Sequence, residues 1–224
     1  MKITILSVVP EMLSSLQASP IVQHAMQKGI LELEIVDIKE YADGSFRHID
    51  DSPFGGGAGM IMRCEPVYRA YRSVCSNGCH TIIPTPAGIP YTQKKAHELC
   101  GYEHLVLIAG HYEGLDERIF DLADERICMG DYIVSGGEYA CMSITDSIVR
   151  LLPGVIRKES TEEESFENGL LEYSQYTKPV EFEGKRVPDV LRSGNHGAIA
   201  QFRHEDALKK TAQYRPDLLE KYKD

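Results

Sequence analysis

Along the chain, segments with the hydrophobic pattern of buried strands alternate with segments that have the pattern of amphipathic helices. Short apolar runs rich in β-branched residues predict buried strands, and the segments between them carry the spacing of amphipathic helices. Because strands and helices alternate in this way, we expect an α/β fold with a parallel sheet covered on both faces. The predicted strands lie at residues 3–9, 31–38, 80–85, 104–109 and 125–129.

Helical patterns separate these strands and return at the end of the chain. The predicted helices of the first part reach to about residue 28 and then cover 65–75, 92–99, 116–122 and 138–152. After a polar, acidic stretch the helical pattern resumes at Arg203, and Pro216 stands at a plausible first-turn position. We therefore predict a body at 1–160, a linker at 161–176 and a small helical domain at 177–224.

Charge changes the picture of possible partners. The 224 residues include 34 acidic and 24 basic side chains, which give a formal net charge of −10. Such a charge argues against a nucleic-acid partner, because phosphate contacts need Lys and Arg. However, the segment from Lys185 onward holds nine basic residues against six acidic ones. A weakly basic tail fits a localised RNA contact, and it equally fits a solvated helical end.

The apolar runs and the cysteines indicate the compartment. No run approaches the roughly 20 apolar residues that span a bilayer, and the first run stops at Pro10 without a signal-peptide cleavage site. We expect a cytoplasmic protein with no membrane association. The six cysteines are scattered, so all are predicted to be free thiols. Cys75 and Cys79 have no second pair at zinc-site spacing, so no metal site is predicted.

Three predicted strands end in glycine-bearing loops, with the sequences PTPAG, AGHYEG and MGDYIVSGG. Ligands of open parallel sheets bind beyond the carboxyl ends of the strands, where glycine lets the backbone approach a ligand closely. None of the loops is a dinucleotide or phosphate loop, which favours a nucleotide moiety without a pyrophosphate. A fourth cluster, DDSPFGGGAGM, starts at Asp50. It is either a flexible connection or a segment that passes close to a ligand or a second subunit.

Several blocks of sequence carry a resemblance to a known family. DDSPFGGGAGM, GHYEGLDER, GDYIVSGGE, DSIVRLLPG, SFENGLLEYSQYTKP and VPDVLRSGNH occur in order along the chain. With them the chain resembles the bacterial tRNA (guanine-N1)-methyltransferase family, which methylates the guanosine immediately 3′ of the anticodon, guanosine-37. The resemblance implies S-adenosyl-L-methionine as the methyl donor and tRNA as the substrate. It also implies that residues 1–160 form a SPOUT methyltransferase domain whose deep trefoil knot binds the cofactor, and that the helical domain at 177–224 binds tRNA. The family further implies a homodimer with each active site at the subunit interface.

The resemblance also implies which residues hold the cofactor, in a bent form among the glycine loops. The Glu113 carboxylate would lie near the ribose or the methionine amine, although it could instead be a helix-start acid. Family members are thought to need Mg²⁺, for which we see no dedicated cage. The implied cofactor-binding residues are Thr85, Pro86, Ala87, Gly88, Gly110, Tyr112, Glu113, Met129, Gly130, Asp131, Tyr132, Ile133, Val134, Gly136, Gly137 and Ala140.

Methylation of guanine N1 requires loss of its proton, so the reaction needs a general base and a cation or donor at O6. The resemblance implies Glu164 as the base, where the family usually has Asp, and Arg150 as its partner. Glu164 could also belong to a solvated acidic run, and Arg150 could simply complement a helix dipole. The implied substrate-binding residues are Asp50, Gly55, Gly56, Gly57, Asn195, His196 and Arg203, although Asn195 and His196 could form a structural cap.

Two other functions stay open at the level of sequence. One is a different knotted RNA methyltransferase activity that modifies another base or a ribose 2′-hydroxyl. The other is a non-catalytic protein that binds tRNA or an adenosyl ligand, which the Glu at position 164 would permit. Mapping the modified nucleotide separates the first from the main hypothesis. Binding of S-adenosylmethionine without methyl transfer would identify the second.

Overall fold

The computed structural model describes residues 1–44, 47–75, 78–157 and 161–222. The chain divides into two compact units, Met1–Ile156 and Arg157–Asp224, which we call the N-terminal and C-terminal units and describe separately. The expected linker at 161–176 stays a prediction.

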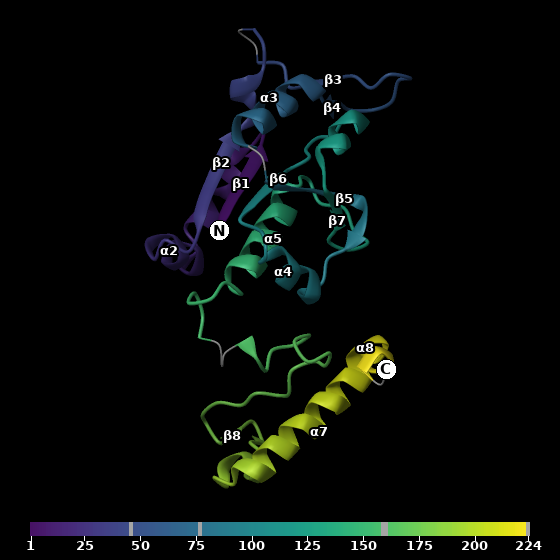
Figure 1. Cartoon of the computed structure of the whole chain (residues 1–224). Coiled ribbons are helices and arrows are strands. Elements are labelled where there is room, and N and C mark those ends of the chain that lie inside the picture. Colours follow the sequence, from purple (N-terminus) through teal and green to yellow (C-terminus); the bar gives the residue numbers. More distant parts are fainter. Residues whose placement is uncertain (45–46, 76–77, 158–160, 223–224) are drawn as a thin grey trace. The chain divides into compact units, whose positions relative to one another are not determined.

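A sheet of five strands forms the centre of the N-terminal unit (Figure 1). Its strands are β1 (Lys2–Ser7), β2 (Glu32–Asp37), β5 (His80–Pro90), β6 (His104–Ile108) and β7 (Glu125–Cys128). The strand order is β2-β1-β6-β5-β7, and every adjacent pair is parallel. The predicted α/β class with a parallel sheet is therefore confirmed.

Helices cover both faces of this sheet, because successive side chains of each strand point to opposite sides. One face packs against α1 (Ser14–Gln17), α2 (Pro20–Gln27), α4 (Gln93–Leu99) and α5 (Glu138–Val149). The other packs against α3 (Cys64–Val74) and the 3₁₀ helices η2 (Ile38–Tyr41) and η3 (Glu117–Leu122). A further 3₁₀ helix, η1 (Pro10–Leu13), precedes α1.

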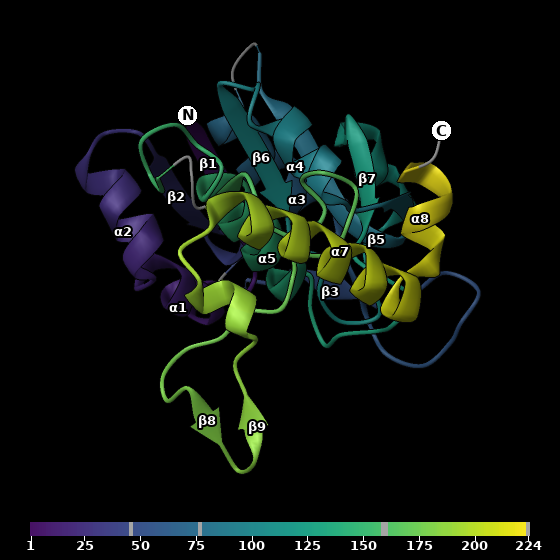
Figure 2. The same ribbon diagram turned by 90° about the horizontal axis from the view of Figure 1, so that it is seen from below.

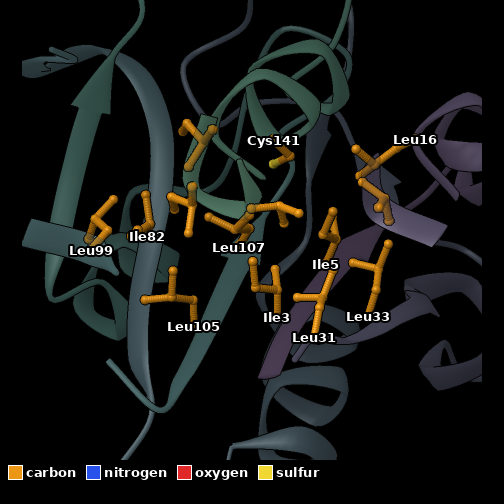
Figure 3. Close-up of a cluster of buried hydrophobic side chains, with 14 of the residues drawn as sticks. Ile3, Ile5, Leu16, Leu31, Leu33, Ile82, Leu99, Leu105, Leu107 and Cys141 are labelled. Atoms are coloured by element: carbon orange, nitrogen blue, oxygen red, sulfur yellow. The ribbon is translucent and has the colours of Figure 1, made fainter. Parts of the chain in front are cut away.

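The larger hydrophobic core lies between the sheet and the α1, α2, α4 and α5 layer (Figure 3). Ile5 of β1 and Leu107 of β6 are fully buried in it, together with Cys141 of α5. Their strand neighbours Leu6 and Ile108 are fully buried in the core on the opposite face. This alternation is the reason that β1 and β6 carry apolar side chains on both faces, as expected for parallel strands buried on both faces.

Several elements differ from the sequence prediction. The first helix is broken, because Pro20 lacks an N–H and begins a new helix, α2. Strand β5 continues to Pro90 instead of ending near residue 85, since the chain pairs with Ile127 of β7 both at Pro84 and again at Ile89. Residues between these two contacts form an irregularity that the apolar pattern does not reveal. A short hairpin of β3 (Asp50–Asp51) and β4 (Ile61–Met62) was also missed.

The prediction that all six cysteines are free thiols is wrong for one pair. Cys75 and Cys79 form a disulfide, with Cα atoms 5.8 Å apart. Cys75 caps the C-terminus of α3, and Cys79 directly precedes β5, so the two elements bring the thiols together. The scattered spacing of the cysteines along the sequence does not reveal which thiols the fold brings close together. The free thiols are Cys64, Cys100, Cys128 and Cys141.

Among its described residues, the C-terminal unit contains two longer helices and a small hairpin. These are α7 (His196–Tyr214), α8 (Pro216–Tyr222), the strands β8 (Glu181–Phe182) and β9 (Lys185–Arg186), and the 3₁₀ helix η4 (Asp189–Arg192). Helix α7 begins seven residues before the predicted start at Arg203. The Asn195 side chain accepts a hydrogen bond from the Ala198 N–H at 3.2 Å and so caps this helix.

The segment before the hairpin is attached to α7 through side chains. The Leu171 N–H donates to Thr211 Oγ1 at 2.9 Å, and the Ser174 N–H donates to the Asp206 carboxylate at 2.6 Å. Figure 2 shows the β8–β9 hairpin as a projection joined to the rest of this unit by two chain segments. Within the described ranges, no helix of either unit has the length and apolar character needed to cross a membrane.

Candidate cofactor-binding site

A cavity of about 360 Å³ opens beside the irregular stretch of β5 and the carboxyl ends of β6 and β7, next to the start of α5. Thirteen of the sixteen residues predicted to hold the cofactor line it. They are Thr85, Pro86, Gly110, Tyr112, Glu113, Met129, Gly130, Tyr132, Ile133, Val134, Gly136, Gly137 and Ala140. Residues of all three glycine loops therefore line the same cavity. This is the arrangement expected for ligand-binding loops that follow the strands of a parallel sheet.

Three of the predicted residues do not line the cavity. Gly88 packs against the neighbouring strand, because a Cβ at this position would lie 2.6 Å from backbone atoms of Arg126 and Ile127. Ala87 is exposed, and its N–H lies 3.4 Å from Thr85 Oγ1. Asp131 is exposed as well. The role of Gly88 in this structure is a close approach between strands.

The lining also includes residues that sequence reasoning missed. His111 and Gly114 lie inside the AGHYEG region, and Ser135 lies inside MGDYIVSGG, so proximity to the glycine loops was a usable signal. The apolar residues Leu115 and Phe120 could not be found in this way, because a periodic apolar pattern reads equally as core. The full set of missed lining residues is Pro84, His111, Gly114, Leu115, Phe120, Ile127, Cys128 and Ser135.

Gly137 sets the distance between α5 and the end of β6. Its N–H donates to the Gly110 carbonyl oxygen at 2.6 Å, and a Cβ here would lie 2.7 Å from the Gly110 nitrogen. Atoms that are not bonded do not approach so closely, so a larger residue would push the helix start away from the strand. The two glycines therefore allow the loop and the helix to form adjoining walls of one cavity.

A buried carboxylate lies directly behind this wall. Glu138, in the first turn of α5, is fully buried, and the Ser7 hydroxyl donates a hydrogen bond to its Oε1 at 2.7 Å. Its Oε2 lies 3.2 Å from Nδ1 of His111, which faces the cavity. The Val9 N–H in turn donates to Ser7 Oγ at 2.9 Å. This chain of contacts ties the carboxyl end of β1 to a cavity-lining side chain.

The GHYEG loop is strained and is held by the long glycine loop. Tyr112 has a φ of 59°, in the left-handed region that residues other than Gly and Asn rarely adopt. The Glu113 N–H donates to the Met60 carbonyl at 3.0 Å, and a Cβ on Gly59 would lie 2.3 Å from Glu113 Cγ. Gly59 is therefore required for the Glu113 side chain to occupy its position. The DDSPFGGGAGM cluster thus contacts the cofactor-loop region at its C-terminal end.

The cavity-lining Tyr112 has a hydroxyl whose pKa is shifted by its surroundings. Burial raises the pKa of its hydroxyl, and the nearby Asp50 carboxylate raises this pKa further. Asp50 lies in β3, whereas Gly55, Gly56 and Gly57 are exposed in the loop that follows, with positive φ values. None of these four predicted substrate-binding residues lines the cavity.

The remaining predicted residues belong to other surroundings. Arg150 is the half-buried C-cap of α5 in the N-terminal unit, and its N–H donates to the Asp146 carbonyl at 3.1 Å. In the C-terminal unit, Glu164, His196 and Arg203 line one hollow of about 720 Å³. Three predicted residues from separate sequence blocks therefore meet in one place.

Arg203 contacts two side chains that line this hollow, Tyr173 and Glu163. Its guanidinium lies over the Tyr173 ring, 4.5 Å from the centroid, and Nη1 lies 3.5 Å from the Glu163 carboxylate. The Tyr173 hydroxyl donates to Glu163 at 2.6 Å, and burial together with this bond raises the Tyr173 pKa to about 12. Across the described ranges, no group of three His, Cys, Asp or Glu side chains is placed to hold a metal ion.

The fold and the cavity together define an α/β protein with a glycine-walled cavity beside the strand-end loops of a parallel sheet. Comparison with known proteins assigns the family. The profile of the family described as tRNA (Guanine-1)-methyltransferase TrmD matches residues 1–221. The chain therefore belongs to this methyltransferase family.

Individual relatives agree with this assignment. The tRNA (guanine-N(1)-)-methyltransferase of Geobacillus kaustophilus is 48% identical over 99% of this chain and 93% of its own length. The proteins of the same name from Lactobacillus johnsonii and Listeria welshimeri are 46% and 45% identical, over 98% and 99% of this chain and 91% and 93% of their own lengths. The match extends through both units.

Proposed function

We propose that the protein transfers the methyl group of S-adenosyl-L-methionine to N1 of guanosine-37 in tRNA, in the cytoplasm and as a homodimer. The observation that carries the proposal is the family match over the whole chain, together with a glycine-walled cavity in which three strand-end loops meet. We further propose that these loops are threaded as the trefoil knot of the SPOUT fold.

The residues of the cavity fit an adenosyl cofactor. Its described lining residues include glycines, aliphatic side chains and aromatic rings, and none of them is Lys or Arg. An uncharged purine could therefore be held by backbone groups and packing. Glu113 supplies a carboxylate suited to a ribose hydroxyl or an ammonium group. When bound there, S-adenosylmethionine would supply an electrophilic methyl group. Any Mg²⁺ would be held partly by the substrate, since the described residues contain no group of three His, Cys, Asp or Glu side chains placed to hold a metal ion.

The proposed chemistry assigns the proton and the developing charge to separate side chains. The Glu164 carboxylate accepts the proton from guanine N1, which leaves the N1 lone pair available to attack the methyl carbon. The Arg150 guanidinium donates hydrogen bonds to O6, where negative charge accumulates. Support comes from the sequence, since Arg150 lies within DSIVRLLPG and Glu164 directly precedes SFENGLLEYSQYTKP, and from the common hollow of Glu164, His196 and Arg203.

The same hollow supports the substrate assignment. Arg203 and His196 are proposed to contact the RNA around the target guanosine, and Gly55 to Gly57 with Asp50 to contact the substrate from the long loop. Asn195 already has a structural task as the cap of α7. We therefore propose that Asn195 contributes to substrate binding by placing the neighbouring His196 at the start of α7.

Substitutions of the two proposed catalytic residues test the mechanism. Arg150→Ala and Glu164→Gln should each lower kcat by about 100-fold or more, since a general base contributes about 10²–10⁴. Donor affinity, measured by calorimetry, should stay at the parent value. Glu164→Asp restores the residue usual in the family and should remain active, and Glu162→Gln is the matched control from the same acidic run. Parent rates in both Arg150→Ala and Glu164→Gln would contradict the mechanism while leaving the family unchanged.

A further inference from the structure

The N-terminal unit carries a covalent link that the proposed chemistry does not use. The Cys75–Cys79 disulfide joins the residue that ends α3 to the residue that directly precedes β5, with Cα atoms 5.8 Å apart. The cofactor cavity lies further along β5, which contributes Pro84, Thr85 and Pro86 to its lining, and neither cysteine reaches it. The disulfide therefore has a role other than contact with the donor.

Stabilisation of the fold is a weak reason for this disulfide. In the chain-entropy account a disulfide stabilises more when it closes a longer loop, and this one joins residues only four positions apart. Proteins that depend on disulfides are mostly small secreted domains without a sufficient core. The N-terminal unit instead buries two hydrophobic clusters, one on each face of its sheet. The unit therefore has the means to fold without this link.

Contacts that do not involve the sulfur atoms hold the same junction. The Cys75 N–H donates to the Tyr71 carbonyl oxygen at 2.8 Å and completes the last turn of α3. The Thr81 hydroxyl of β5 donates to the Tyr71 hydroxyl at 3.3 Å. The Thr81 N–H donates to the Asp124 carboxylate at 2.8 Å. Because these hydrogen bonds are independent of the disulfide, we expect α3 and β5 to stay in place when it is reduced.

The disulfide is also within reach of small reactants. Cys75 and Cys79 are both half-buried, and Gly78, which lies between them in the sequence, is exposed. The Tyr71 hydroxyl lies 3.7 Å from Cys79 Sγ, a distance from which it can donate to a thiolate. The thiolate is the form that attacks and leaves in thiol–disulfide exchange. A partly exposed disulfide of this kind is open to exchange.

The proposed location favours a transient bond over a permanent one. The proposed function assigns the protein to the cytoplasm, where small thiols and thioredoxin keep most cysteines reduced. Disulfides that do form there usually serve catalysis or redox sensing. Catalysis is not the role here, since neither Cys75 nor Cys79 lines the cavity. The bond is therefore expected to form and break with the thiol balance of the cell.

We propose that Cys75 and Cys79 form a reversible oxidation site that exchanges with low-molecular-weight thiols and, when oxidised, fastens the end of α3 to β5. In the oxidation, one protein thiolate attacks a small-molecule disulfide and releases one thiol. The second protein thiolate attacks the mixed disulfide, forms the Sγ–Sγ bond and releases the second thiol. The protein loses two electrons and two protons, which the small disulfide takes up. The inference rests on the cytoplasmic location of the proposed function.

Equilibration of the whole protein with glutathione mixtures, followed by alkylation in denaturant and intact-mass measurement, tests the reversibility. With about 5 mM reduced and about 0.05 mM oxidised glutathione the protein should carry six alkyl groups, and with about 2.5 mM of each it should carry four. Cys64→Ser removes a free thiol from the same helix and is the control, so its Cys75–Cys79 pair should titrate like the parent. A pair that stays oxidised in the first mixture, or stays reduced in the second, would overturn the proposal.

The melting temperature of the two forms tests the fastening of α3 to β5. The oxidised parent should melt about 2–8 °C above the reduced parent, the scale for a short disulfide loop in a chain of this size. The Cys75→Ser, Cys79→Ser double variant should melt at one temperature in both mixtures. Equal melting temperatures of the two parent forms would overturn the proposal. Neither measurement uses donor or tRNA, so a reversible pair in a protein without methyl transfer refutes only the proposed function. Methyl transfer by a protein whose pair does not titrate refutes only this inference.

Discussion

At the scale of single residues, the cavity depends on side chains that are absent as much as on those present. The Gly137 nitrogen lies 2.6 Å from the Gly110 carbonyl oxygen, and the absence of a side chain at Gly59 leaves room for the Glu113 side chain. In each case the space that a Cβ would need is already filled. The small residues of these loops are therefore explained by contacts within the protein, before any ligand is considered.

Gly137→Ala should lower the free energy of unfolding by about 1–3 kcal/mol, the usual cost of overpacking, and should weaken donor binding because the cavity wall moves. Urea unfolding and calorimetry measure the two effects. Gly197→Ala is the matched control, because a Cβ there would lie 3.6 Å from the nearest atom, and alanine in helix α7 should raise stability by about 0.5–1 kcal/mol. Equal stability of Gly137→Ala and the parent would contradict this reading.

Glu138 provides a second prediction at this scale. Glu138→Ala leaves the Ser7 hydroxyl and the His111 ring without a buried partner, so the free energy of unfolding should fall by about 2–3 kcal/mol. Because His111 lines the cavity, donor affinity should also fall. Glu138→Gln keeps an oxygen for Ser7 and should lose less. Glu117→Ala, which removes a side chain that is 79% exposed, is the control and should behave like the parent.

At the scale of elements, η3 shows how a cap and an ion pair combine. The Asp116 carboxylate accepts the Arg118 N–H at 3.0 Å and also accepts from Nε and Nη2 of the same residue at 2.9 and 2.7 Å. The Arg118 guanidinium is the main reason that the pKa of Asp116 lies well below its usual range. The start of η3 is thus held by one ionised side chain.

This lowered pKa predicts a pH dependence with a definite sign. The carboxylate stabilises the folded state fully above the pKa of an unfolded Asp, about 3.9, and the stabilisation is lost as the pH falls below that value. Asp116→Asn should therefore be less stable than the parent at pH 7, and the difference should shrink below pH 4. Urea unfolding between pH 7 and 3 measures it. A difference that stays constant down to pH 3 would refute the assignment.

Elements also show which parts of the fold the sequence can predict. The five strands were located from their apolar runs, because burial on both faces demands them. The extension of β5 to Pro90 was not predictable, since it depends on a second pairing with β7 and runs through two prolines. The two-residue strands of the β8–β9 hairpin and the early start of α7 at His196 were missed for a related reason. The positions of these elements are determined by a short turn and a helix cap, which the apolar periodicity of the sequence does not reveal.

At the scale of the whole molecule, the site is predictable where backbone rules apply. The strand-end rule located the three loops, and thirteen of the sixteen proposed cofactor residues lie around one cavity. Glu138 escaped prediction because an acid in a helix's first turn reads as a dipole partner, and burial is a property of the folded unit. The contributions of Arg150 and Glu164 stay predictions, because they belong to different units.

The most direct test of the central claim is methyl transfer from labelled S-adenosylmethionine to tRNA transcripts that carry either G or A immediately 3′ of the anticodon. The modified nucleotide is then identified by nuclease digestion and mass spectrometry. We predict one methyl group per tRNA at N1 of the guanosine, and none on the transcript with adenosine. Methylation of another base or of a ribose hydroxyl, or cofactor binding without any transfer, would contradict the proposed function.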